Sequence, residues 1–140
     1  MSADPSLIVR TAELPGSPDK PSEDRIFHTP KAVIVLDGAS QAIKLERDGG
    51  WMAEELGHRL ADGLLAEPDC DLAKLLEASI ADLADVYRLV PGQSPSATTS
   101  IVRLSGQQLD VMVLCDSPVV VLDMDGRIHE IRDDRIDEAA

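Results

Sequence analysis

The alternation of apolar and polar positions divides the first third of the chain into short strands and one loop. Apolar runs at residues 6–12, 25–29 and 31–37 have the composition of β-strands, and Pro30 between the last two is typical of a hairpin turn. The stretch ELPGSPDKPSED carries three prolines and a glycine, which predicts an irregular loop. We therefore expect three strands here, the second and third joined as a hairpin.

The middle of the chain changes to the period of an α-helix. Leucines and a methionine recur every four positions within residues 48–66, which predicts one amphipathic helix. Apolar residues at helical spacing predict a second helix over residues 70–89, with Asp69 or Asp71 as its N-cap.

The last third returns to strand patterns, at residues 97–104, 108–115, 118–124 and 127–132. The connectors between them are short, which favours antiparallel hairpins. Because strands and helices do not alternate, helices layered on an antiparallel sheet fit the pattern better than a parallel nucleotide-binding fold. We expect a single α+β domain over residues 1–140.

Composition excludes several classes of partner. The formal net charge is −13, so a phosphate backbone would be repelled and nucleic acid is not an expected partner. The chain start lacks the pattern of a signal peptide, and no apolar run reaches the length of a membrane span. Cys70 and Cys115 match no metal-binding spacing. These features predict a reduced, cytoplasmic protein without a membrane partner.

Carboxylates stand at both ends of the first predicted hairpin. If Pro30 and Lys31 form its turn, Asp24 falls directly opposite Asp37, where like charges are destabilising unless something neutralises them. Magnesium or manganese would do so, because hard cations prefer carboxylate oxygens. The alternative is that Asp37-Gly38 is a polar turn and that the acidic residues before the hairpin are a polar loop edge. The spacing leaves both interpretations open.

A second motif, VVVLDMDGRI, is similar to the first motif of haloacid dehalogenase phosphatases, with Asp123 as nucleophile and Asp125 as acid and base. That motif opens a parallel domain, whereas only 14 residues follow Gly126 here. An Asp-Gly turn between two strands accounts for the same residues. The histidines have no helical partner at metal-binding spacing, and we find no specific nucleophile.

A more extensive resemblance covers nearly the whole chain. In order, SEDRIF, AVIVLDGAS, SATTSIVRL, LDVMVLCDSPVVVLDMDG and IRDDRI resemble the N-terminal half of the metal-dependent protein serine/threonine phosphatases of the type 2C family. The resemblance implies an antiparallel β-sandwich with flanking helices, in α-β-β-α layers, of which these 140 residues would form an incomplete part.

The resemblance also implies a site with two or more Mg²⁺ or Mn²⁺ ions that activate a water to attack a phosphomonoester. Asp37 would be the bridging ligand and the pivotal catalytic residue, and the carbonyl of Gly38 would hold one ion. Glu23 and Asp24 would act mostly through coordinated waters. Asp116 would be the ligand of a third, looser ion. The implied substrate is phosphoserine or phosphothreonine in a protein, or a small phosphomonoester.

The sequence departs from the family pattern at three places. Asp19 replaces the arginine that clamps the substrate phosphate, Ala39-Ser40 replaces a glycine-rich turn, and Cys115 stands where glycine is usual. The second half of the family's fold, with its further aspartates, is expected to be missing from these residues. The alternative function is therefore a non-catalytic regulatory or binding module that retains part of the fold.

Overall fold

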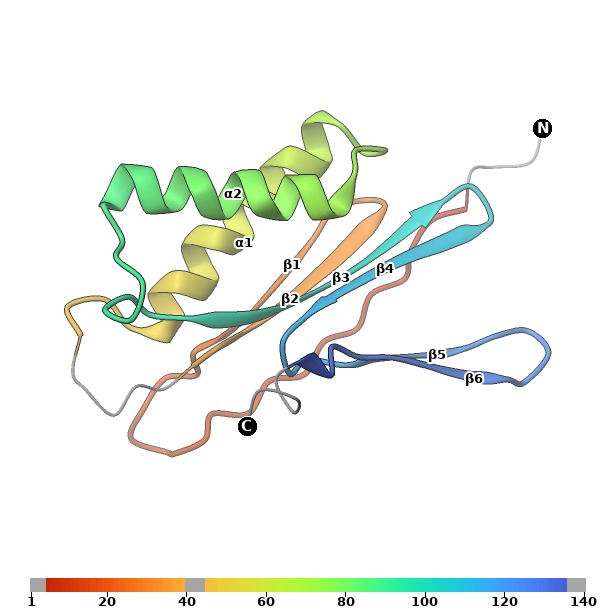
Figure 1. Cartoon of the computed structure of the whole chain (residues 1–140). Helices are drawn as coiled ribbons and strands as arrows, with labels where there is room; N and C mark the ends of the chain where they lie inside the picture. The colour runs from red at the N-terminus through yellow and green to blue at the C-terminus, as the bar shows by residue number, and fades with distance from the viewer. Residues whose placement is uncertain (1–4, 40–44, 136–140) are drawn as a thin grey trace.

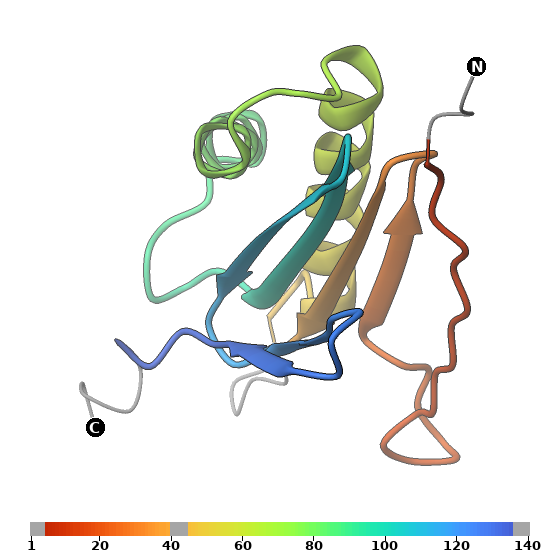
Figure 2. The same ribbon diagram turned by 90° about the vertical axis from the view of Figure 1, so that its right-hand side faces the viewer.

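The computed structural model describes residues 5–39 and 45–135. Two helices lie over one face of a four-stranded antiparallel sheet, and two further strands form a separate hairpin on the other side (Figure 1; Figure 2). The sheet has the order β1-β2-β3-β4. Its strands are β1 Asp24–His28, β2 Ala32–Gly38, β3 Ala97–Ser105 and β4 Gln108–Leu114; the hairpin is β5 Val119–Leu122 with β6 Ile128–Ile131. The helices are α1 Gly49–Ala66 and α2 Leu72–Tyr87.

Each helix begins at an aspartate that caps its first turn. The Asp48 carboxylate accepts a hydrogen bond of 2.8 Å from the Trp51 amide, and Asp71 accepts one of 3.0 Å from Lys74. Helix α2 ends where Arg88 adopts the left-handed conformation, with φ of 53°. The caps therefore make α2 slightly shorter than the predicted span of 70–89.

The core lies between the helices and the sheet. Along β2 the residues alternate, so that Ala32, Ile34 and Leu36 are buried against the helices while Val35 and Asp37 lie on the opposite face. The helices contribute leucines at the predicted spacing. Buried apolar side chains of this core are Ala53, Leu56, Leu60, Leu64, Leu72, Leu76, Leu83 and Ile101.

The opposite face of the sheet is only partly covered. The β5–β6 hairpin lies on this side (Figure 1; Figure 2) and turns its own outer face to solvent. Val120, Leu122 and Ile128 on that outer face are 64%, 68% and 73% exposed. The second layer of the expected sandwich thus consists of a two-stranded hairpin, which agrees with an incomplete α-β-β-α arrangement.

One predicted element is absent. The structure has no strand over residues 6–12. Burial nevertheless alternates along this segment, because Leu7 and Val9 are half-buried while Ile8 between them is 89% exposed. A strand needs a neighbour with which to exchange backbone hydrogen bonds, and none of the described strands pairs with these residues. A hydrogen bond connects the start of this segment to the β1–β2 turn instead: the Lys31 ammonium donates to the Pro5 carbonyl at 2.8 Å.

Candidate functional site

Asp24 and Asp37 are paired residues of the β1–β2 hairpin. The strand register places them directly opposite each other, as the turn at Pro30 and Lys31 predicts, and their side chains point to the face of the sheet away from the helices. Burial of Asp37 raises the pKa of its carboxyl, and the hydrogen bond and charge of Asp24 raise it further, followed by the charges of Asp116 and Glu23. The two aspartates therefore form a closely opposed carboxyl pair at one end of the hairpin.

The backbone at the end of β2 is packed too tightly for any side chain at residue 38. A Cβ on Gly38 would lie 2.4 Å from the Gly49 backbone and 2.8 Å from the Glu23 carbonyl oxygen. The Gly38 amide donates to that same oxygen at 3.3 Å. Residues 23, 38 and 49 are thus held together by direct backbone contact, which fixes the start of α1 beside the aspartate pair.

Hydrogen bonds of hydroxyl groups connect the turn after β4, residues 115–118, to the sheet face on which Asp37 lies. Thr98 lies opposite Asp37 in the β2–β3 register. Its hydroxyl is hydrogen-bonded to the Ser117 hydroxyl, and the Ser100 hydroxyl donates to the Ser117 carbonyl. These bonds bring Asp116 into the neighbourhood of Asp37, close enough for its charge to raise the Asp37 pKa.

The Asp133 carboxylate, in the C-terminal segment, is hydrogen-bonded to the same turn at Cys115. The Cys115 amide, at φ of 66°, donates to the Asp133 carboxylate at 2.9 Å. Arg135 forms an ion pair with Asp133 at 2.7 Å, and these bonds hold the Asp133 pKa far below its ordinary value. Cys115 therefore adopts the conformation that favours glycine, with its amide satisfied by Asp133.

The donor set suits one hard divalent cation in part. Carboxylate and carbonyl oxygens from Asp24, Asp37 and Gly38 have the chemistry that Mg²⁺ and Mn²⁺ prefer. Within residues 5–39 and 45–135, however, no group of three or more His, Cys, Asp and Glu side chains is close enough to hold one ion. The aspartate pair is the centre of the candidate site, and Glu23 and Asp116 contribute charge around it.

The remaining predicted positions are spread out. Asp19 lies in an exposed loop, and its amide donates to the Ser17 hydroxyl at 3.3 Å. Ser40 falls outside the described residues. Asp123 accepts bonds from the Asp125 and Arg127 amides, each at 2.9 Å, as a turn residue of the β5–β6 hairpin does. This turn is the interpretation we favoured over the dehalogenase-like motif.

The hydroxyl network was not identified from the sequence, although one signal for it exists. In SATTS, Thr98 and Ser100 alternate with Thr99, and this period places both on the Asp37 face of a strand. Their bonds to Ser117 join residues 17 and 19 positions apart, which spacing alone does not predict.

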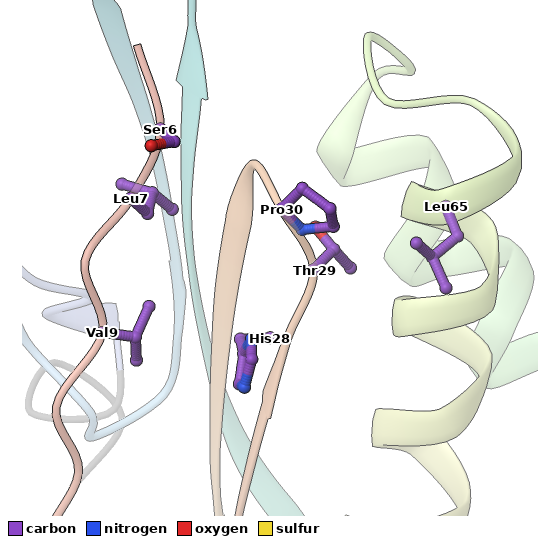
Figure 3. Close-up of a pocket in the computed structure, with 7 residues that line it drawn as sticks. All are labelled: Ser6, Leu7, Val9, His28, Thr29, Pro30 and Leu65. Carbon is purple, nitrogen blue, oxygen red and sulfur yellow. The ribbon is translucent and has the colours of Figure 1, made fainter.

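A cavity of about 440 Å³ lies at the other end of the hairpin (Figure 3). The N-terminal segment contributes Leu7 and Val9, the β1–β2 turn contributes His28 and Pro30, and α1 contributes Leu65. Because β1 and β2 run antiparallel, this turn is at the opposite end of both strands from Asp24 and Asp37. The cavity therefore does not belong to the carboxylate site.

This fold is that of part of a PPM serine/threonine phosphatase. The structure matches the PPM Ser-Thr phosphatase MsPP from Mycobacterium smegmatis, solved in complex with cacodylate, with a TM-score of 0.65 and 18% identity over 86% of this chain and 50% of that one. It also matches the serine/threonine phosphatase PstP/Ppp of Mycobacterium tuberculosis, with a TM-score of 0.54 and 19% identity over 98% of this chain and 58% of that one.

The chain thus spans about half the length of the phosphatase structures that it matches. A scan of protein-family models and a search of curated protein sequences found no significant match. The fold that the resemblance implied, an incomplete α+β phosphatase fold, is confirmed. No helix in the described parts of the chain is long and apolar enough to cross a membrane.

Proposed function

We propose that the chain carries the carboxylate centre of a metal-dependent phosphomonoester hydrolase. The observation that supports this function is the opposed pair Asp24 and Asp37, at the end of β2, on a fold shared with serine/threonine phosphatases. Two like charges in direct opposition are stabilised when a cation lies between them.

In this proposal Asp37 is the principal ligand of Mg²⁺ or Mn²⁺, and the Gly38 carbonyl is a second oxygen donor. Asp24 and Glu23 contribute charge and hold coordinated water, and Asp116 contributes charge from the turn after β4. A bound divalent cation supplies activation of water and neutralisation of phosphate charge. The substrate class is phosphoserine or phosphothreonine in a protein, or a small phosphomonoester.

The first experiment measures hydrolysis of p-nitrophenyl phosphate with and without Mn²⁺, and repeats it with Asp37→Asn. Turnover that needs Mn²⁺ and is lost in the variant supports the proposal. Mn²⁺ binding is measured separately by calorimetry on both proteins. If neither turnover nor Mn²⁺ binding is detected in the wild type, the hydrolase function is wrong for this chain.

The second candidate is a non-catalytic binding module with the same partial fold. It is favoured by the absence, among the described residues, of a group of three His, Cys, Asp or Glu side chains that could hold one ion. Under this function Mn²⁺ binding would be weak, hydrolysis would not be detectable, and Asp37→Asn would leave binding of a phosphorylated partner intact. The two functions therefore differ in what they predict for the wild type: Mn²⁺-dependent hydrolysis of p-nitrophenyl phosphate under the first, and none under the second.

A further inference from the structure

A second cavity, of about 270 Å³, lies beyond the end of α2. Its walls come from residues 45–47, which precede α1, and from the loop that joins α2 to β3. The Ala39 amide donates to the Ser96 carbonyl at 2.9 Å, so this loop is bonded to the residue that follows Asp37-Gly38. The cavity is therefore at the same end of the sheet as the aspartate pair (Figure 1).

Arg47 presents a fixed guanidinium at this cavity. The group lies 4.9 Å from the centre of the Trp51 ring and 4.7 Å from that of Tyr87. Trp51 and Tyr87 are themselves in edge contact, with ring centres 4.8 Å apart. One N–H of the Arg47 guanidinium donates to the Tyr87 carbonyl at 3.4 Å. A guanidinium has five N–H donors, so the others are available to a ligand. Because the Arg47 guanidinium stacks on the Trp51 and Tyr87 rings, it is already oriented before any ligand binds.

Arg88 is a second arginine among the residues that line the same cavity. Its backbone is in the left-handed conformation that ends α2, and its side chain is exposed. In the part of the chain that the structure describes, neither Arg47 nor Arg88 forms an ion pair with a carboxylate. The described arginines that do form such pairs are Arg25, Arg59, Arg103, Arg132 and Arg135. Among the described residues, this cavity therefore has two arginines whose charge no carboxylate neutralises directly.

Negatively charged groups that line the cavity are fewer than positively charged ones. Glu46 also lines it, and the last carbonyls of α2 carry the negative end of the helix dipole. Arg47 already binds one of those carbonyls. Gln93 adds an amide, and Leu45, Leu89, Val90 and Pro95 give apolar walls that lower the local dielectric. The lining thus includes two arginines and one glutamate, a balance that favours an anionic ligand.

We propose that this cavity binds the phosphate group of a phosphorylated serine or threonine side chain in a polypeptide. Guanidinium groups bind phosphate oxygens in a bidentate geometry, and the apolar walls accommodate the carbon atoms of the phosphorylated residue. The choice of ligand rests on the proposed phosphatase function. In this proposal the cavity holds a phosphorylated segment at the same end of the sheet as the aspartate pair, and it supplies a phosphate-binding group that Asp19 cannot provide.

The test uses the single tryptophan of the chain as its reporter. Because Arg47 stacks on Trp51, a ligand at this guanidinium changes the Trp51 emission. We would titrate the metal-free protein with a peptide that carries one phosphoserine, at constant ionic strength set with sodium chloride. A saturable emission change is expected, and Arg88→Gln and Arg47→Gln each weaken binding by about fivefold or more, since each removes a charge-assisted hydrogen-bond donor set.

The matched control is Arg127→Gln, an exposed arginine in the β5–β6 turn, for which unchanged affinity is expected. The same titration followed by the amide NMR signals of Gln93 and Ser94 detects binding that leaves the emission unchanged. The proposal is overturned if both measurements show no saturation, if Arg88→Gln and Arg127→Gln bind equally well, or if the unphosphorylated peptide binds as tightly. Equal affinity for inorganic phosphate and the phosphopeptide would overturn the assignment to a phosphorylated side chain.

This binding test contains no metal and measures no hydrolysis. A failure of binding therefore leaves the proposed hydrolase function standing. Conversely, a chain that binds phosphopeptide at Arg47 and Arg88 but does not hydrolyse p-nitrophenyl phosphate would contradict the hydrolase function alone.

Discussion

Asp24 and Asp37 face each other across the β1–β2 hairpin, and burial, followed by the hydrogen bond and charge of Asp24, raises the pKa of Asp37. The folded state therefore holds a proton on Asp37 more tightly than the unfolded chain does. Stability falls as the pH rises from the ordinary Asp37 pKa of 3.8 through the raised one.

Asp37→Asn should therefore stabilise the metal-free protein at neutral pH. We expect a gain of about 0.5 kcal/mol, within the range for opposed residue pairs on neighbouring strands. The gain should disappear below the ordinary pKa, because Asp37 is then protonated in both states. Urea unfolding at neutral and acidic pH measures this difference. Asp116→Asn is the control and should gain less; a variant less stable than wild type at neutral pH would contradict the repulsion.

Gly38→Ala should destabilise the protein by about 2 kcal/mol, the usual cost of forcing extra atoms into a packed position. The new Cβ would meet the Gly49 backbone at 2.4 Å, and neither strand nor helix can move without breaking the hairpin or the start of α1. Thermal unfolding measures the loss. Gly16→Ala is the matched control, because nothing lies within 4 Å of a Cβ there. Equal effects at both positions would show that the close backbone contact is not rigid.

The hairpin register could be predicted from local sequence, because Pro30 and Lys31 fix the turn and the alternation of β2 fixes the face. The strand expected at residues 6–12 could not be decided in this way, since strand formation depends on a neighbour elsewhere in the chain. The same limit applies to the bond between the Ser117 and Thr98 hydroxyl groups. The stacking of Arg47 on Trp51 and Tyr87 also joins segments whose approach depends on how the two helices pack.

Thr99→Val should raise stability by about 1 kcal/mol, because it removes a buried hydroxyl without a hydrogen bond and keeps the side-chain shape. The Thr99 side chain is fully buried, and its Oγ1 has no hydrogen-bond partner among residues 5–39 and 45–135. Chemical denaturation measures the gain. Thr98→Val, which removes a hydroxyl bonded to Ser117, should lose stability instead. A loss at both positions would imply that Thr99 has a partner, such as an internal water.

Asp110→Ala should cost about 3 kcal/mol, because it leaves the buried Arg103 guanidinium without its carboxylate. Arg103 pairs with Asp110 at 2.8 Å, and its bonds lower the pKa of Asp110. The contribution of this pair should therefore be lost at acidic pH, as Asp110 becomes protonated. The matched control is Asp82→Ala, which breaks the more exposed pair with Arg59 and should cost about 0.5 kcal/mol. Urea unfolding of both variants measures the two losses of stability, and equal losses would contradict the stronger dependence of Arg103 on its carboxylate.

The outward face of the β5–β6 hairpin has a consequence for the behaviour of the protein in solution. Val120, Leu122 and Ile128 are exposed apolar side chains, so we expect them to attract other molecules at short range, while the net charge of −13 keeps molecules apart at long range. Salt or a pH near the isoelectric point of about 4.4 removes that repulsion. Light scattering should then increase with protein concentration, and Leu122→Lys should suppress the increase. Colloidal stability in this protein thus depends on its acidic surface.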